Sequence, residues 1–193
     1  MSGLDTRLFF AMNQFAGQNC WLDGFFIFMA QYSPIILAIF LVWQYFTRKQ
    51  LIQTRKTIWL SLLSFVVAEA AAKVMGLFYS HPQPFVRLTG VHLLIPHAVD
   101  NAFPSDHSLL FFSIMGIFCL VKKEQYRWTY LLIATVVAIS RIWVGVHSPI
   151  DALGGAIIGI TSAYLVRWLN IRLKKVSIWT SRLSLYFFPH RFR

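Results

Sequence analysis

Charged side chains are scarce in this chain of 193 residues. Asp, Glu, Lys and Arg make up 13% of it, against about 25% in soluble domains, while 57% of the residues are hydrophobic. So few charges exclude a soluble domain with an ordinary solvated surface. The composition instead predicts an all-α integral membrane protein with little mass outside the bilayer, forming a single domain over 1–193.

Cysteine and acidic residues are scarce as well. The two cysteines, Cys20 and Cys119, lie far apart, which argues against a disulfide framework. Seven acidic residues face 18 basic ones, and the formal net charge is +11. In a soluble protein this excess would indicate nucleic-acid binding, but here the basic residues stand in short clusters between apolar runs, as in membrane proteins. We therefore expect membrane lipids, and no nucleic acid, as partners.

Long apolar runs predict five transmembrane helices, at 25–46, 57–79, 105–121, 128–146 and 149–171. Pro34 inside the first run predicts a kink. A short amphipathic helix over 4–15 is expected to lie at the membrane interface. The stretch 80–104 is predicted to be a long loop without regular structure, a type that is usually functional. The basic tail 176–193 is expected on the cytoplasmic membrane surface.

The basic residues also predict the orientation in the membrane. Of the 18 lysines and arginines, 14 lie in 47–57, in 121–128 and from residue 167 onward. Basic loops stay in the cytoplasm, so the N-terminus and the loop 80–104 are expected outside. The start of the third run, the end of the fourth and the start of the fifth share that outer face, where we expect the active site.

His147 and Asp151 are the first candidate catalytic pair. They are four residues apart, which is about one helical turn, so the carboxylate can hold the imidazole in the tautomer that acts as a nucleophile. A purely structural interpretation also fits, since Ser148 suits an N-cap, Pro149 suits the first helical position and Asp151 would complete a capping box. The two interpretations are compatible.

The segment Pro104-Ser105-Asp106-His107 and Arg141 suggest an anion site. Ser105 suits a helix N-cap, and a helix N-terminus attracts anions. His107 would lie in the first turn of that helix. Arg141 stands in an apolar run, where a charge is costly, so it either binds phosphate with its planar fork or extends to lipid headgroups.

Glu69 and Lys73 form a second charged pair, inside the run 57–79. Their spacing of four residues allows a neutralising ion pair, or Lys73 contacts phosphate with Glu69 as its partner. The loop histidines match no zinc spacing, so no metal or cofactor is expected. Gly155 and Gly159 form a G-x-x-x-G pattern, which predicts close helix packing within the bundle or, more rarely, dimerisation. The oligomeric state stays open.

Together these motifs resemble the signature of the type 2 phosphatidic acid phosphatase superfamily over about 57–165. Its third motif, S-R-x5-H-x3-D, is matched by Ser140, Arg141, His147 and Asp151. Its second motif, P-S-G-H, is present with Asp106 in place of glycine. The first motif, K-x6-R-P, departs: Gln83 stands where arginine is expected, and Lys73 precedes it by ten residues instead of seven. Arg87 or His81 are candidates to replace the missing arginine.

More narrowly, the runs 94–98 and 103–107 are similar to BcrC-type undecaprenyl-diphosphate phosphatases, which are associated with bacitracin resistance. This resemblance implies hydrolysis of undecaprenyl diphosphate at the outer face of a bacterial inner membrane. It implies His147 as nucleophile, Asp151 as the group that holds its tautomer and His107 as proton donor and acceptor, without a metal. The implied phosphate-binding residues are Ser105, Arg141, Lys73, Gln83 and Asp106. The alternatives are a phosphatase for another lipid phosphate, such as phosphatidylglycerol phosphate, and a non-catalytic lipid-binding or transport protein.

Overall fold

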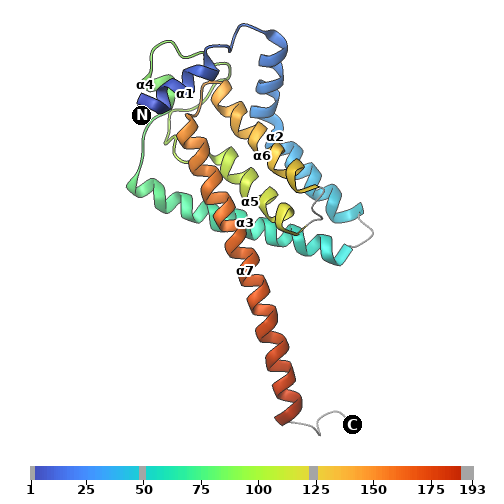
Figure 1. Ribbon diagram of the computed structural model, residues 1–193. Helices are drawn as coiled ribbons and strands as arrows, with labels where there is room; N and C mark the ends of the chain where they lie inside the picture. Colours follow the sequence, from blue (N-terminus) through green and yellow to red (C-terminus); the bar gives the residue numbers. More distant parts are fainter. Residues whose placement is uncertain (1–2, 48–50, 122–125, 188–193) are drawn as a thin grey trace.

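The computed structural model describes residues 3–47, 51–121 and 126–187, with side chains over 3–46, 52–121 and 126–173. Within these residues the chain is helical, as predicted, and contains no strand (Figure 1). The helices are α1 (Gly3–Asn13), α2 (Cys20–Thr47), α3 (Leu51–Phe78), α4 (Pro84–Arg87), α5 (Asp106–Val121), α6 (Arg127–Trp143) and α7 (Pro149–Phe187). Each apolar run of the sequence therefore forms one helix.

Three of the helices are long and apolar enough to cross a membrane. These segments are Cys20–Phe46 in α2, Ile52–Phe78 in α3 and Pro149–Leu173 in α7. The apolar helix α5 has 16 residues and α6 has 17, which is shorter than the roughly 20 residues that a full span needs. The predicted total of five spans therefore stays a prediction.

Several helix boundaries differ from the predicted ones. The helix α2 begins at Cys20 and not at residue 25, and α3 begins at Leu51 and not at residue 57. The stretch 80–104 contains α4, so the expectation of a wholly irregular loop was wrong; Pro84 begins this short helix because its fixed φ suits a first turn. The helix α6 ends at Trp143 and not at residue 146. The chain turns at Gly145, where φ is +86° and a Cβ atom would lie 2.7 Å from the His92 carbonyl oxygen. The helix α7 continues beyond 171, while the side chains of the tail 176–193 lie outside the described residues.

The helix α5 lies at the centre of the bundle, beside α3, α6 and α7 (Figure 1). Gly155 and Gly159 let α7 approach α5 closely, which confirms the packing prediction for the G-x-x-x-G pattern. A Cβ atom at Gly155 would lie 2.6 Å from the Ser105 carbonyl oxygen, and one at Gly159 would lie 2.8 Å from the Ser113 nitrogen. The two helices therefore pack closely from Ser105, directly before α5, to Ser113 of α5.

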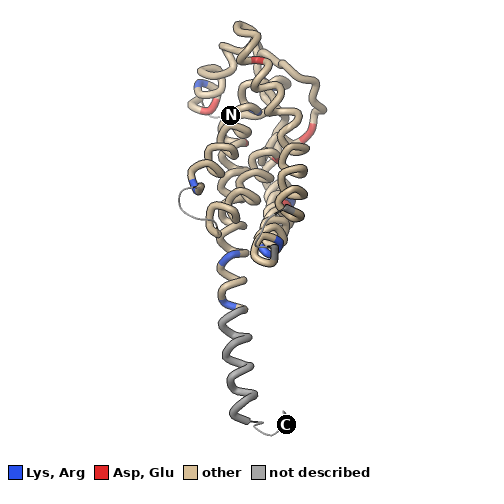
Figure 2. The backbone as a smooth tube through the Cα atoms, turned by 90° about the vertical axis from the view of Figure 1, so that its right-hand side faces the viewer, with Lys and Arg blue, Asp and Glu red and all other residues tan. Residues whose placement is uncertain are grey.

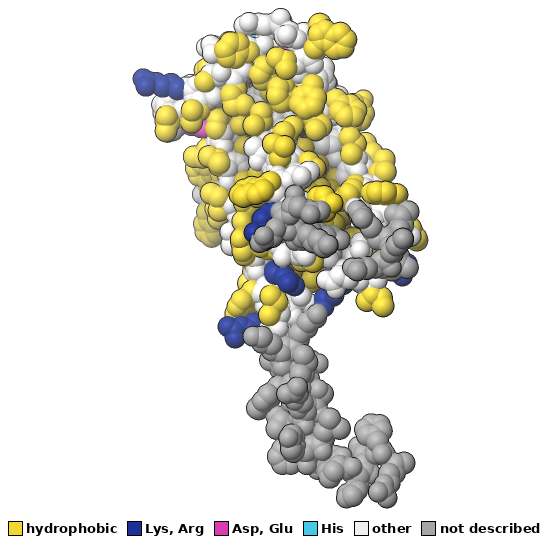
Figure 3. All heavy atoms as spheres, turned by 45° about the vertical axis from the view of Figure 1, so that its right-hand side comes forward, with side chains coloured by type: hydrophobic (Ala, Val, Ile, Leu, Met, Phe, Trp, Pro, Cys, Tyr) yellow, Lys and Arg dark blue, Asp and Glu magenta, His cyan; other side chains and the backbone are white. Residues whose placement is uncertain are grey.

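The outer surface of the bundle is apolar. Large hydrophobic side chains such as Trp21, Leu77 and Phe78 are more than four-fifths exposed, and hydrophobic residues cover the face shown in Figure 3. A soluble monomer does not expose so much contiguous apolar surface. In Figure 2 the blue lysines and arginines gather toward the end of the bundle opposite the loop 80–104. The surface is that of a protein embedded in lipid.

Candidate active site

The first turn of α7 is built around the Asp151 carboxylate. The backbone N–H of Ser148 donates to Asp151 Oδ2 at 2.8 Å, as in a capping box, with Pro149 at the first helical position. From α1, Asp5 Oδ1 accepts the Ile150 N–H at 3.0 Å. The Asp151 backbone carbonyl accepts the Ser105 N–H at 3.0 Å, so the starts of α5 and α7 are tied together.

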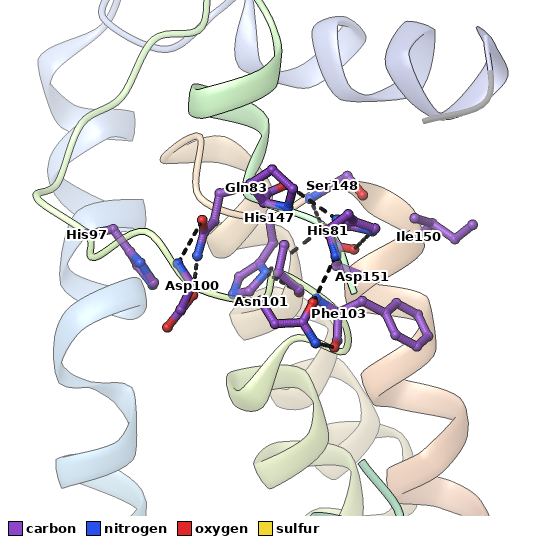
Figure 4. Close-up of polar contacts among 12 residues, drawn as sticks. His81, Gln83, His97, Asp100, Asn101, Phe103, His147, Ser148, Ile150 and Asp151 are labelled. Atoms are coloured by element: carbon purple, nitrogen blue, oxygen red, sulfur yellow. Dashed lines mark hydrogen bonds and ion pairs between the residues drawn. The ribbon is translucent and has the colours of Figure 1, made fainter. Parts of the chain in front are cut away.

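His147 stands directly before this turn and is 5% exposed. Its Nδ1 lies 3.0 Å from the Ala102 carbonyl oxygen and 4.0 Å from Asp151 Oδ2 (Figure 4). The structure thus adds a second acceptor to the one expected from the sequence. A carbonyl accepts only from N–H, so Nδ1 carries the proton and the lone pair of Nε2 is free.

Asp151 itself lies between two histidines. Its side chain is fully buried, and Oδ1 is 3.2 Å from His81 Nε2 (Figure 4). His81 precedes α4 and is far from Asp151 in sequence, so no local spacing predicted this contact. One carboxylate therefore caps a helix, faces the His147 ring and pairs with His81.

The environment of His147 favours its neutral form. Burial lowers the pKa of His147 well below its ordinary value, and the neighbouring Arg141, His97 and His107 lower the pKa further. A neutral imidazole is the form that can attack an electrophile. His147 is therefore ready for attack without losing a proton first.

Arg141, in the last turn of α6, is 4% exposed. The alternative in which it extends to lipid headgroups is therefore wrong, because the side chain points into the bundle. Its Nη1 donates to the Ala30 carbonyl oxygen of α2 at 3.0 Å, and its buried Nε has no hydrogen-bond partner among the described residues. A buried guanidinium with an unpaired N–H is suited to an anion.

The second motif lies at the start of α5, as predicted. Ser105 occupies the N-cap position, but its fully buried hydroxyl makes no capping bond and has no partner among the described residues. His107 follows in the first turn and lies near Arg141 and His97. Asp106, between them, is exposed and faces α3. The free Ser105 hydroxyl and the first-turn N–H groups of α5 offer donors to an anion.

Lys73 lies farther out than the other predicted residues. Its side chain is 77% exposed, and Nζ is 3.8 Å from Glu69 Oε1. Both residues line a cavity of about 400 Å³ between α3 and α5, together with Asp106. The predicted ion pair is therefore present, and it stands at the mouth of a cavity that leads to the second motif.

Gln83 is fully buried and holds the loop that follows α4. Its side-chain nitrogen donates to the Ala98 carbonyl oxygen at 3.2 Å and to Asp100 Oδ1, and its side-chain oxygen accepts the Asp100 N–H at 3.3 Å (Figure 4). These bonds occupy both amide hydrogens and the amide oxygen. In this structure the Gln83 side chain therefore bonds to its own protein chain and has no amide hydrogen left to donate to a substrate.

Comparison with known proteins identifies the family. Residues 57–175 match the model of the PAP2 superfamily. The chain belongs to the PAP2 superfamily. It is 39% identical to "Bacitracin transport permease protein BcrC" of Bacillus licheniformis, over 96% of this chain and 88% of the relative. It is 30% identical to "Undecaprenyl-diphosphatase BcrC" of Bacillus subtilis (strain 168), over 84% and 82%. The crystal structure of Aquifex aeolicus LpxE superposes with a TM-score of 0.73 at 25% identity, covering 85% of this chain and 94% of that one.

His97 lies beside the candidate site, although the sequence motifs did not include it. It stands on the loop that Gln83 holds, and its ring centroid is 6.1 Å from that of His147. His97 also lies close enough to act on both His107 and His147. The only signal in the sequence was the similarity of the run 94–98 to BcrC-type enzymes, which carries no role for the histidine.

The described residues offer no evident metal site. No three His, Cys, Asp or Glu side chains in this part of the chain lie close enough together to hold a metal ion. The two carboxylates nearest the histidines, Asp151 and Asp100, are engaged with Ser148 and Gln83. Metal-free chemistry stays a prediction, which a chelator can test.

Proposed function

We propose that this protein hydrolyses undecaprenyl diphosphate to undecaprenyl phosphate and inorganic phosphate, and so recycles the carrier lipid of cell-envelope synthesis. One observation carries the proposal: the buried guanidinium of Arg141 has an unpaired N–H and shares its surroundings with His107 and His147. Such a cluster of positive and proton-transferring groups matches a phosphate ester or anhydride. The names of two relatives, both of them undecaprenyl-diphosphatases, support the substrate.

In the first step the Nε2 lone pair of His147 attacks the terminal phosphorus. A nitrogen–phosphorus bond forms while the bond from that phosphorus to the bridging oxygen breaks. His107 donates a proton to the departing oxygen, and undecaprenyl phosphate leaves. The Ala102 carbonyl keeps the proton on His147 Nδ1, and the Asp151 carboxylate stabilises the positive charge that develops on the ring.

In the second step water attacks the phosphohistidine. His107, now neutral, takes a proton from that water, the nitrogen–phosphorus bond breaks, and inorganic phosphate leaves. Both steps pass through the same charged phosphoryl group. Arg141, the Ser105 hydroxyl and the N–H groups at the start of α5 stabilise its oxygens, so the chain itself supplies the positive field that a metal supplies in other phosphatases.

The residues of the first motif, Lys73 and Gln83, contribute to phosphate binding without contacting the transferred phosphoryl group. Lys73 lines the cavity beside Asp106, where its charge attracts the diphosphate of the incoming substrate while the lysine stays paired with Glu69. Gln83 holds the loop of His97, and the His97 ring lies beside that of His147. Asp106 borders the entrance and orients the lysine by charge. In this arrangement Arg141 is the principal phosphate ligand.

We also propose five spans in a bacterial inner membrane, with the site facing the exterior. Most of the lysines and arginines that the structure describes lie toward the end of the bundle opposite the loop 80–104, which supports this orientation (Figure 2). Two exposed positions allow a test in a background without Cys20 and Cys119: Thr89→Cys for the outer side and Gln53→Cys for the inner side. An impermeant thiol reagent should label only the first in intact spheroplasts, and labelling of only the second would reverse the orientation.

Phosphate release from purified protein tests the reaction itself. The panel contains undecaprenyl diphosphate, phosphatidylglycerol phosphate and phosphatidic acid, with His147→Ala as the matched control. We expect the diphosphate to give the highest kcat/KM, EDTA to leave turnover intact and vanadate to inhibit. Preference for phosphatidylglycerol phosphate would change the substrate. Binding of lipid without turnover would favour a lipid-binding or transport protein, in line with the permease name of one relative.

A further inference from the structure

Pro34 lies inside α2 and leaves one backbone carbonyl without its usual donor. In an α-helix the N–H of each residue donates to the carbonyl four residues earlier, but proline has no N–H. The carbonyl that loses its donor belongs to Ala30. Ala30 is 1% exposed, so its oxygen needs a partner from elsewhere in the protein.

The partners of that oxygen come from the proposed catalytic machinery. Arg141 Nη1, 111 residues later in the chain, donates to it at 3.0 Å. The backbone of Ala30 also lies near the ring of His107 and acts on it. A single carbonyl of α2 thus meets the phosphate-binding residue of α6 and the proton-transferring residue of α5.

We propose that the Ala30 carbonyl, released by Pro34, positions Arg141 and His107 for phosphoryl transfer. The inference rests on the proposed function and adds a positioning role for a residue pair outside all three family motifs. One N–H of Arg141 is tied to α2, which aims the remaining donors, Nε among them, away from α2. The carbonyl holds one ring nitrogen of His107, so the other ring nitrogen is directed to the substrate.

A carbonyl suits this role better than a carboxylate would. An aspartate beside Arg141 would neutralise the guanidinium and compete with the phosphate for it. A carbonyl carries only a partial negative charge, so it orients both side chains and leaves the positive charge available. Pro34 provides that carbonyl in an apolar helix without placing an acidic residue in the membrane.

The test restores the missing N–H. In Pro34→Ala and Pro34→Ser the new N–H competes for the Ala30 carbonyl, while Ser33→Ala, one residue earlier and also buried, leaves that carbonyl unchanged. Positioning groups of this kind are worth about 10–100-fold. We expect both Pro34 variants to lose kcat in this range and to shift the pH profile of kcat, with thermal stability equal or higher because proline disfavours a helix interior. Ser33→Ala should match the wild type.

Ring ¹⁵N NMR of histidine-labelled protein provides a readout without turnover. The His107 signals, assigned from their loss in His107→Gln, should move in both Pro34 variants and not in Ser33→Ala. Unchanged kcat, pH profile and His107 signals in the Pro34 variants would overturn the proposal. So would a loss confined to Pro34→Ala, or a loss that follows a lower melting temperature, since either would indicate packing alone. If the wild type hydrolyses no lipid phosphate, the proposed function fails while the NMR comparison still decides this inference.

Discussion

Two regions of the molecule contribute to the proposed site in different ways. One is the corner between α6 and α7, and the other is the segment that runs from α3 to the loop after α4. In the corner, Arg141, His147 and Asp151 lie within eleven residues and keep the family motif intact. Along the other segment, Lys73 is exposed and Gln83 bonds to its own chain. In the proposed mechanism the corner presents reactive groups directly, whereas the other segment acts through a loop and a cavity. A motif can therefore change its residues where its role is support.

The largest effect should come from the corner. Arg141→Lys keeps the positive charge but loses the planar fork and the geometry of the Ala30 contact. Losing one preorganised donor to a transition-state oxygen typically costs about 10²–10³ in kcat, and we expect a loss in that range in phosphate-release assays. Arg167→Lys, on α7 away from the named site, should have no effect. A normal kcat for Arg141→Lys would move phosphate binding away from the corner.

The supporting segment should show a smaller and coupled effect. Gln83→Ala frees the loop that carries His97, and His97→Ala removes the imidazole that this loop places beside His147. We expect each change to lower kcat by about 10–10², and the double variant to lose little more than either one, because both act through the same loop. Additive losses in the double-mutant cycle would separate Gln83 from His97.

Replacing Lys73 should lower kcat less than replacing Arg141, Gln83 or His97. Its exposed amino group is paired with Glu69, so Lys73→Met should reduce kcat by less than about tenfold, as expected for a screened surface charge. Glu69→Gln is the matched variant, because it breaks the same pair and keeps the lysine. A loss of 10² or more in Lys73→Met, with Glu69→Gln active, would place Lys73 on the phosphate in the transition state.

The sequence predicted the corner well and the supporting segment poorly, for a physical reason. Contacts between residues one helical turn apart are encoded by spacing, so the pairing of Ser148 with Asp151 and the packing of Gly155 were predictable. The carbonyls of Ala30 and Ala102 reach the site through tertiary structure. A backbone oxygen has no residue type to recognise, so spacing cannot reveal it.

The smallest effect concerns stability at low pH. The folded state holds the pKa of His147 below its ordinary value, so below a pH of about 6.5 the unfolded chain binds a proton that the folded chain does not. Stability should therefore fall on acidification, by up to about 1.4 kcal/mol per pH unit from this residue. Melting temperatures in detergent from pH 7.5 to 5 should decline less steeply in His147→Asn. Parallel declines would show that burial of His147 does not set this dependence.

Trapping the covalent intermediate tests the central claim, attack by His147, most directly. The departing group is itself a phosphate, so the first step depends less on His107 than the second, in which water must be activated. His107→Gln, mixed with substrate labelled in its terminal phosphate and quenched in base, should therefore accumulate a base-stable, acid-labile phosphoenzyme. Peptide mapping should place the phosphate on His147, and His107→Gln/His147→Asn should give none. Label on another residue, or an unlabelled enzyme that still releases phosphate, would contradict the account.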